Sequence, residues 1–320
     1  MNRIIGTLAV LALVAPVASA QQVKVEASIP AYQKTSGVSG NLNSIGSDTM
    51  NNLMTLWGEA FAKIYPNVKI QVEGKGSSTA PPALIAGTAQ LGPMSRAMRG
   101  TEIDQFEAKF GYKPTQLRTS YDALAVYVNK DNPLEKATLA DIDGAFSKSR
   151  RRGGKNVGTW GQIGLTGDWA ARPINLYGRN SASGTYGFFK EHALSNGDYK
   201  DTVKEQPGSA SVVQGVTADR FGMGYSGIGY KTSGVKVVAL ATKAGDAYSD
   251  GSYEDVVSGK YPLARFLYMY VNKAPGKDLD PVVREFLKFV FSREGQEIVV
   301  KDGYYPLPAK VVAEENAKLK

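Results

Sequence analysis

The sequence predicts an α/β protein built as two lobes. Segments with a strand pattern and segments with helix spacing alternate along most of the chain, which favours open sheets with helices on both faces. Two similar apolar strand runs, at 124–129 and 266–272, suit a chain that crosses to a second lobe and later returns. About 300 residues follow the first twenty, which is enough for two lobes of ordinary domain size.

The first twenty residues have the pattern of a secretory signal peptide. Arg3 precedes an apolar run over 4–17 and the small residues Ala18-Ser19-Ala20. This run is too short to span a membrane, and the sequence has 0 Cys, so we expect neither a lipid anchor nor a disulfide. The mature protein is therefore expected to begin near Gln21 in the periplasm, with residues 21–40 as a flexible arm.

The charge balance narrows the class of partner only slightly. The chain has 38 basic and 30 acidic residues and a net charge of +8. Such a surface can attract anions, nucleic acid or membrane headgroups by long-range steering. Export makes nucleic acid the least expected of these, and the aromatic residues do not alternate with basic ones in any run. We therefore expect no nucleic-acid partner.

The first element of the globular part is a short strand over 41–46. Ser47, Asp48 and Thr49 follow it, and apolar residues then recur every three or four positions from 53 to 64. That spacing marks one face of an amphipathic helix. The three polar residues are therefore expected at a helix N-terminus.

Two further strands are expected to lead into polar corners. An alternating strand is followed by a glycine-serine stretch that contains Ser77 and Ser78, and two prolines then open a helix. A shorter apolar piece, 90–94, leads to Ser95 and Arg96. Each corner again places hydroxyl groups at the end of a strand.

The middle of the chain has its longest strand run and a basic loop. The run covers 121–129, and Thr138 is expected to cap a short helix beyond it. Residues 147–172 are rich in glycine and basic residues, which predicts a long surface loop. Its triplet Arg150-Arg151-Arg152 either attracts an anionic ligand or is a solvated charge run.

The fourth corner has the strongest signal. An apolar run over 173–177 predicts a strand, and residues 186–194 predict a helix. Between them lie Arg179, Ser183, Gly184 and Thr185. A strand that turns into a helix directs free N–H groups and the positive end of the helix dipole at one point, which favours an anion. Hydroxyl groups add donors, and a guanidinium adds a planar fork suited to a tetrahedral oxyanion. An ordinary serine cap beside a solvated arginine is the alternative.

The last third of the chain continues the alternation. The predicted elements are a helix over 209–216, a glycine-dense strand and turn over 221–230, strands over 235–240 and 266–272, and an amphipathic helix over 280–291. The lysine-rich end after Lys310 is expected to fray.

Four corners thus present hydroxyl groups, backbone N–H groups or arginines at helix starts. One such corner is weak evidence, but four in one α/β chain indicate a shared anion site, because ligands in such folds lie beyond the carboxyl ends of the strands. The candidate ligand-binding residues are Ser47, Asp48, Thr49, Ser77, Ser78, Ser95, Arg96, Arg179, Ser183, Gly184 and Thr185.

With these motifs the chain resembles the periplasmic phosphate-binding proteins of ABC transporters, the PstS family, over residues 41–308. Gly46-Ser47-Asp48-Thr49 looks like the first phosphate loop of that family, Gly74-Lys75-Gly76-Ser77-Ser78 like the second, and Arg179-x-x-x-Ser183-Gly184-Thr185 like the third. The resemblance implies a two-lobed type II periplasmic binding fold with the ligand cleft between the lobes. The two lobes would close on a dehydrated phosphate.

The resemblance also implies a division of the chain and a partner. Lobe 1 is expected to comprise 41–124 plus 265–320, and lobe 2 to comprise 125–264. The closed form is expected to dock on the membrane permease of a phosphate ABC transporter. We further expect a monomer with no cofactor and no metal.

One position departs from the family pattern. Well-known members have an aspartate after the second loop that accepts a hydrogen bond from the proton on phosphate, and sulfate, which lacks that proton, is excluded. Here Ser95 and Arg96 occupy that stretch, and both would donate. We hypothesise that Asp48 supplies the missing acceptor.

Three other functions remain open at this point. Another oxyanion, such as sulfate, molybdate or tungstate, is the nearest alternative ligand. A secreted phosphatase is less favoured, because the chain has the single histidine His192, no Cys and no cluster at metal-ligand spacing. No base partner is evident for Ser47 or Ser183, so we expect a binding protein and no enzyme. A structural or adhesive surface protein, the third class, would not need four donor corners.

Overall fold

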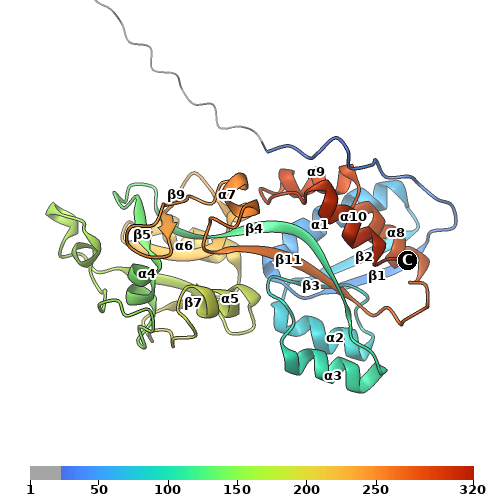
Figure 1. Cartoon of the computed structure of the whole chain (residues 1–320), viewed down its shortest axis with the longest axis horizontal. Coiled ribbons are helices and arrows are strands. Elements are labelled where there is room, and N and C mark those ends of the chain that lie inside the picture. The colour runs from blue at the N-terminus through green and yellow to red at the C-terminus, as the bar shows by residue number, and fades with distance from the viewer. Residues whose placement is uncertain (1–22) are drawn as a thin grey trace, which may run out of the picture.

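A computed structural model describes residues 23–320, and the chain is organised around one long strand. Strand β4 (Thr115–Asn129) pairs along its first half with β11 (Ala264–Val271) and along its second half with β8 (Gly222–Gly227), antiparallel in both cases. Figure 1 shows β4 and β11 running between two bodies of the molecule. The predicted signal peptide lies outside the described residues.

We call the body on the N-terminal side of β4 lobe 1. It includes the parallel pair of strands β1 (Gly40–Ile45) and β2 (Val68–Glu73). An isolated parallel bridge between Ser44 and Leu91 connects β1 to the chain that leads into β3. Its other elements are α1 (Asn51–Ile64), α2 (Ala80–Ala86), β3 (Gly92–Met94), α3 (Gly100–Phe110), α8 (Pro281–Val290), α9 (Arg293–Lys301) and α10 (Ala309–Ala317). Short 3-10 turns precede α1 at Asp48–Met50 and α2 at Ser77–Thr79.

We call the other body lobe 2. Its helices are α4 (Leu139–Phe146), α5 (Gly184–His192), α6 (Ser209–Ala218) and α7 (Tyr253–Val257). Its strands besides β8 are β5 (Lys136–Thr138), β6 (Asn175–Arg179), β7 (Lys204–Gln206), β9 (Val235–Val237) and β10 (Ala239–Ala241). The central sheet has the order β3-β11-β4-β8-β6-β7, and β9 also pairs with β4.

Each lobe has its own buried core. The core of lobe 1 contains Trp57, Phe61 and Phe286, and that of lobe 2 contains Phe146 and Phe189. Within residues 23–320 the two main clusters have no buried residue in common. The arrangement is consistent with the predicted lobes, whose residue boundaries stay a prediction.

The central sheet is mixed, with antiparallel and parallel parts. Its middle strands β11, β4 and β8 are antiparallel, and only β8, β6 and β7 form a parallel part. The predicted surface loop over 147–172 is largely irregular and exposed, but Trp160 within it is fully buried in the core of lobe 2. Among the residues that the structure describes, no helix is long and apolar enough to cross a membrane.

Residues 23–40 pack against lobe 1 where a flexible arm was expected. Ile29 is fully buried, and the Arg293 guanidinium donates to its carbonyl oxygen at 3.1 Å. The Thr35 N–H donates to the Tyr65 hydroxyl at 3.0 Å. Apolar residues at 23, 25, 27 and 29 alternate with polar ones, but this stretch forms no strand, so the pattern does not indicate which of them lobe 1 buries.

The C-terminal end forms a helix where fraying was expected. Glu315 of α10 is fully buried and pairs with Arg118 of β4 and, at 2.6 Å, with the amino group of Lys318. Leu319 is also buried in the core of lobe 1. The expectation was wrong because the lysines of this segment suggested an exposed end, whereas Glu315 and Leu319 are buried and hold the helix against lobe 1.

Asp302, which follows α9, should make stability depend on pH. It is mostly buried and accepts a hydrogen bond from the Asn52 amide, and burial raises the pKa of its carboxyl group to about 6. Because the unfolded value is about 3.9, the stability from this group is present below about pH 4 and lost as the pH rises through about 6. Asp302→Asn should therefore raise the free energy of unfolding at neutral pH by about 1–3 kcal/mol.

The same variant should change stability little near pH 4, where the wild-type carboxyl group is already protonated. Urea titrations at the two pH values measure this difference directly. An equal change in the free energy of unfolding at both pH values would contradict the assignment.

Candidate functional site

The predicted corners meet between the two lobes. The Thr49 hydroxyl lies 2.7 Å from that of Thr185, which lies 3.4 Å from that of Ser95. The Ser77 hydroxyl lies 3.3 Å from that of Ser95. We call these four buried side chains the hydroxyl cluster. Thr49, Ser77 and Ser95 belong to lobe 1 and Thr185 to lobe 2.

The three corners of lobe 1 are joined by their main chains. The Ser47 N–H donates to the Pro93 carbonyl at 2.8 Å, and the Gly76 N–H donates to the Gly46 carbonyl at 2.8 Å. A Cβ atom on Gly46 would lie 2.2 Å from the Pro93 oxygen, so only glycine permits this approach. Parallel strands β1 and β2 end at the same edge and thereby bring their corners together.

Ser183 and Ser78 have side chains that bond to the main chain. Ser183 is the N-cap of α5, and its oxygen accepts from the Thr185 N–H at 3.1 Å and the Tyr186 N–H at 3.3 Å. The Ser78 hydroxyl donates to the Ala182 carbonyl of lobe 2 at 3.1 Å. Ser183 thus fixes the first turn of α5, and Ser78 links its corner of lobe 1 to the residues that precede this helix.

Arg179, the last residue of β6, is almost fully buried at the cleft. Its Nη1 donates to the Ser209 hydroxyl at 2.6 Å, and its Nη2 lies 3.0 Å from Oδ1 of Asp48. Burial lowers the pKa of the guanidinium, and the Asp48 carboxylate opposes that shift. A guanidinium nevertheless stays charged in proteins.

Asp48 connects lobe 1 to the start of a helix in lobe 2. Its Oδ1 accepts the Ser209 N–H of α6 at 2.7 Å, where the helix dipole also favours a carboxylate. Its main-chain oxygen accepts from the Tyr230 hydroxyl at 3.0 Å. Among the described residues, no hydrogen bond reaches its second oxygen, Oδ2.

Arg96 is held apart from the hydroxyl cluster. Its two terminal nitrogens bind the Glu102 carboxylate at 2.7 and 2.6 Å. Burial would raise the pKa of Glu102, but hydrogen bonds from Arg96 and from the Arg99 N–H outweigh it, and the pKa is lowered. A direct role for Arg96 toward a ligand stays a prediction.

A buried ion pair behind the cluster escaped the sequence analysis. Arg265 of β11 donates from Nε and Nη2 to Asp122 of β4 at 2.9 and 2.7 Å. The same guanidinium donates to the Thr185 hydroxyl at 2.9 Å and to the Ser95 carbonyl at 2.8 Å. One acid, Asp122, lies in an otherwise apolar run of β4, and one base, Arg265, lies in an otherwise apolar run of β11. The two residues face each other in the register of these strands, so this pattern of isolated charges could have indicated the pair.

Two donor atoms of this site have no hydrogen-bond partner. Both the Ser47 hydroxyl and Nε of Arg179 are buried and unpaired. A buried polar atom left unpaired costs about 1–3 kcal/mol. Hydroxyl groups and a guanidinium that lack acceptors are suited to an oxyanion. Over residues 23–320, no group of three His, Cys, Asp or Glu side chains could hold a metal ion.

Comparisons with known proteins place the chain in one family. A family model described as a PBP superfamily domain matches residues 31–294. The phosphate-binding protein PstS of Pseudomonas aeruginosa is 59% identical over 288 residues, which are 90% of this chain and 89% of that protein. The SphX protein of Synechococcus elongatus is 28% identical over 290 residues, 89% of this chain and 83% of that protein.

Solved structures share the fold. A candidate phosphate ABC transporter substrate-binding protein from Clostridium perfringens, with bound phosphate, has a TM-score of 0.71 at 22% identity, covering 84% of this chain and 100% of that chain. An ABC-type phosphate transport receptor from Vibrio cholerae has a TM-score of 0.64 at 20% identity, covering 83% of this chain and 100% of that chain. At these identities the likeness shows the fold, which is the predicted two-lobed type II fold.

Proposed function

We propose that this chain, which belongs to the PstS family of phosphate-binding proteins within the PBP superfamily, captures inorganic phosphate between its two lobes. It then delivers the phosphate to the permease of an ABC transporter. We place it in the periplasm as a monomer, after removal of residues 1–20, and without enzymatic activity. The PstS relative of Pseudomonas aeruginosa, whose name describes it as a phosphate-binding protein, supports this function.

The observation that carries the proposal is the pair of unpaired buried donors beside a self-paired hydroxyl cluster. Ser47 Oγ and Arg179 Nε have no acceptor, and the hydroxyl groups of the cluster bond mainly to one another. Each hydrogen bond to a charged group contributes roughly 1.5–3 kcal/mol. A micromolar affinity needs only about 8 kcal/mol, so about six such donors suffice even after the anion is desolvated.

Calorimetric titration tests the function. The mature protein is first stripped of bound ligand by partial unfolding and refolding and is then titrated with phosphate and with sulfate. We expect tight 1:1 binding of phosphate that excess sulfate does not displace. Tight binding of sulfate, molybdate or tungstate instead would mean that the same donor residues bind a different oxyanion. Release of product from a chromogenic phosphate ester would contradict the absence of catalysis.

Asp48 is proposed as the acceptor that distinguishes phosphate from sulfate. Its Oδ1 is occupied by Ser209 and Arg179, which leaves Oδ2 to accept a hydrogen bond from the protonated oxygen that phosphate has and sulfate lacks. Asp48→Asn replaces an acceptor with an amide that can also donate. The ratio of phosphate to sulfate affinity should fall about 10-fold to 100-fold, the equivalent of one hydrogen bond to a charged group.

The ratio of the two affinities is the quantity to compare, because losing the contacts of Asp48 with Arg179 and α6 weakens the binding of both anions alike. Asp219→Asn is the matched control, since Asp219 accepts from the Tyr177 hydroxyl at 3.0 Å on lobe 2 and has no contact with the cluster. An unchanged ratio in Asp48→Asn would remove this residue from selectivity.

A further inference from the structure

Lobe 2 has a basic surface that adjoins the phosphate cleft. We propose that this surface is a second anion site, which binds a linear condensed phosphate of three or more units. We call it the basic face, and it comprises Lys148, Arg150, Arg151, Lys155, Lys190 and Lys200. The proposal goes beyond phosphate capture in the cleft and does not depend on it.

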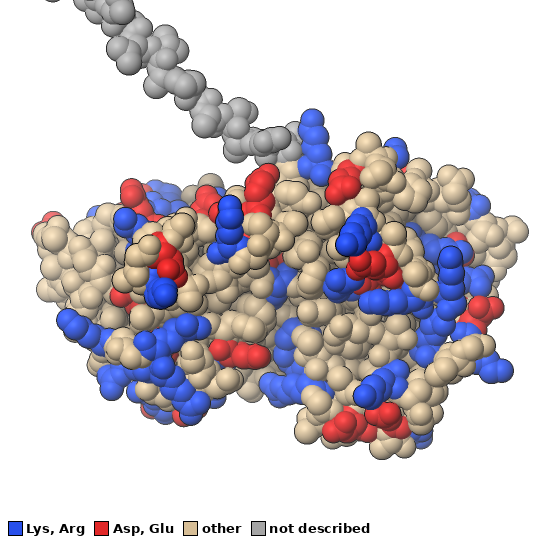
Figure 2. All heavy atoms as spheres, viewed as in Figure 1, with Lys and Arg blue, Asp and Glu red and all other residues tan. Residues whose placement is uncertain are grey.

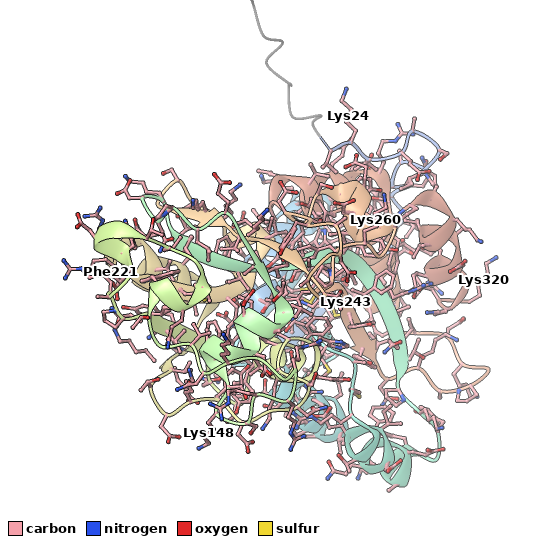
Figure 3. All side chains as sticks on the ribbon, turned by 60° about the vertical axis from the view of Figure 1, so that its left-hand side comes forward. Lys24, Lys148, Phe221, Lys243, Lys260 and Lys320 are labelled. Atoms are coloured by element: carbon pink, nitrogen blue, oxygen red, sulfur yellow. The ribbon has the colours of Figure 1, made fainter. Side chains whose placement is uncertain are left out.

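The charge of the basic face is concentrated in one segment. Residues 147–155 have five basic residues and no acidic one, against a net charge of +8 for the whole chain. Figure 2 shows Lys and Arg side chains gathered over the lower left of the molecule, on lobe 2, and Figure 3 shows Lys148 at the lower edge of that lobe. The side chains of Arg150, Arg151 and Lys155 have no acidic partner among the described residues.

The two ion pairs on the basic face are easily replaced. Lys148 pairs with Asp201 at 3.1 Å and Lys190 with Asp198 at 3.0 Å, and both acids are largely exposed. Exposed pairs of this kind contribute at most about 1 kcal/mol. A more highly charged anion can therefore take these lysines from their present partners.

Three adjoining hollows are lined by four of the six cations of the basic face, namely Lys148, Arg150, Lys190 and Lys200. The first, of about 620 Å³, shares Lys148 and Lys200 with the second, of about 600 Å³. The second shares Lys190 and Tyr186 with a third hollow of about 420 Å³. The third is also lined by Arg265, which bonds to the hydroxyl cluster through Thr185. The hollows thus form a row from the loop at 147–155 to the cleft.

The row is held in place by the fold. The Lys200 amino group donates to the carbonyls of Gly144 and Val157 at 2.8 Å each, and burial, with a smaller effect of Arg150, lowers its pKa. The Ser147 hydroxyl accepts the Arg150 N–H at 3.0 Å and fixes the base of the arginine triplet. A freely solvated run of charges would have neither anchor.

The shape of the basic face selects the class of anion. Four of its six cations line concave hollows, whereas a lipid bilayer presents a flat surface to protruding side chains. One orthophosphate ion is too small to contact more than one hollow at a time. A condensed phosphate has a charge on every unit along a flexible chain, so several units can meet several cations at once.

The test uses sodium tripolyphosphate and the mature protein saturated with inorganic phosphate, so that the cleft is occupied. Calorimetry should show binding that weakens as salt is added, because its origin is electrostatic. The triple variant Lys148→Ala, Arg150→Ala, Lys190→Ala removes three cations that line the hollows and should lose at least about 10-fold in affinity, which is 1.4 kcal/mol. Phosphate affinity in the cleft should stay unchanged in that variant.

A matched triple variant on lobe 1, Lys63→Ala, Lys69→Ala, Lys109→Ala, removes the same charge from α1, β2 and α3. It should keep tripolyphosphate affinity within about 2-fold of wild type, because only nonspecific attraction is lost. Equal losses in the two triple variants would overturn the proposal, since net charge alone would then explain the binding. Equally strong binding of poly-glutamate or of anionic lipid vesicles would overturn it too.

A variant with a blocked cleft separates this proposal from the proposed function. Gly184→Ala, which is expected to prevent phosphate capture, should bind tripolyphosphate as wild type does. Loss of tripolyphosphate binding in that variant, or its absence from the phosphate-saturated wild type, would place the anion in the cleft and refute the second site.

Discussion

Arg179→Ala should weaken phosphate binding by about 10²-fold to 10⁴-fold in a calorimetric titration of ligand-free protein. Arg179 is the buried guanidinium at the cleft whose Nε has no partner. Two hydrogen bonds from its fork to an anion amount to about 3–6 kcal/mol, and each 1.4 kcal/mol is tenfold in affinity. Alanine removes both bonds and the charge.

Three further variants show which part of the loss is due to phosphate contact. Arg179→Lys keeps the charge without the fork and should fall between wild type and alanine. Arg118→Ala removes a guanidinium paired with Glu314 and Glu315, far from the cleft, and should leave affinity unchanged. The double variant Arg179→Ala, Asp48→Ala removes the cost of leaving Asp48 unpaired. Wild-type affinity in folded Arg179→Ala, with folding checked by circular dichroism, would exclude it from the site.

The four corners could be predicted because each is a local pattern. A strand, a short polar stretch and a helix start follow one another within about a dozen residues at Ser47, Ser77, Ser95 and Ser183. Within lobe 1 the parallel edge of β1 and β2 then brings their two corners together. The structure does bring Thr49, Ser77, Ser95 and Thr185 within hydrogen-bond distance of one another.

The remaining features depend on pairings that a single sequence does not reveal. Asp122 and Arg265 meet because β4 and β11 pair in one register, and nothing local to either residue indicates that register. Arg96 lies in a predicted corner, yet Glu102 on the following helix binds its guanidinium. The buried Ile29 and Glu315 were missed for the same reason, because their partners lie on distant segments.

Gly184→Ala should weaken phosphate binding by at least about 100-fold, because it places a methyl group between the closed lobes. A Cβ atom on Gly184 would lie 2.2 Å from Oγ and 2.8 Å from Cβ of Ser77, and 2.7 Å from Oγ of Ser95. Rotation of the Ser77 hydroxyl relieves only the first contact, since its Cβ also clashes. The clash joins lobe 2 to lobe 1, so it penalises the closed form, and we expect closure to become unfavourable by about 3 kcal/mol or more.

Gly187→Ala provides the matched control in the same helix. Its Cβ atom would lie 3.5 Å from the nearest atom, Cδ of Arg96, which is an ordinary contact. Both substitutions exchange glycine for alanine in α5, and alanine inside a helix is favoured by up to about 1 kcal/mol, so neither should unfold lobe 2. Small-angle scattering should show phosphate compacting the wild type and Gly187→Ala but not Gly184→Ala. Closure and full affinity in Gly184→Ala would mean that the bound state is more open at α5 than this structure, and the hydroxyl cluster would then not be the place where phosphate is held.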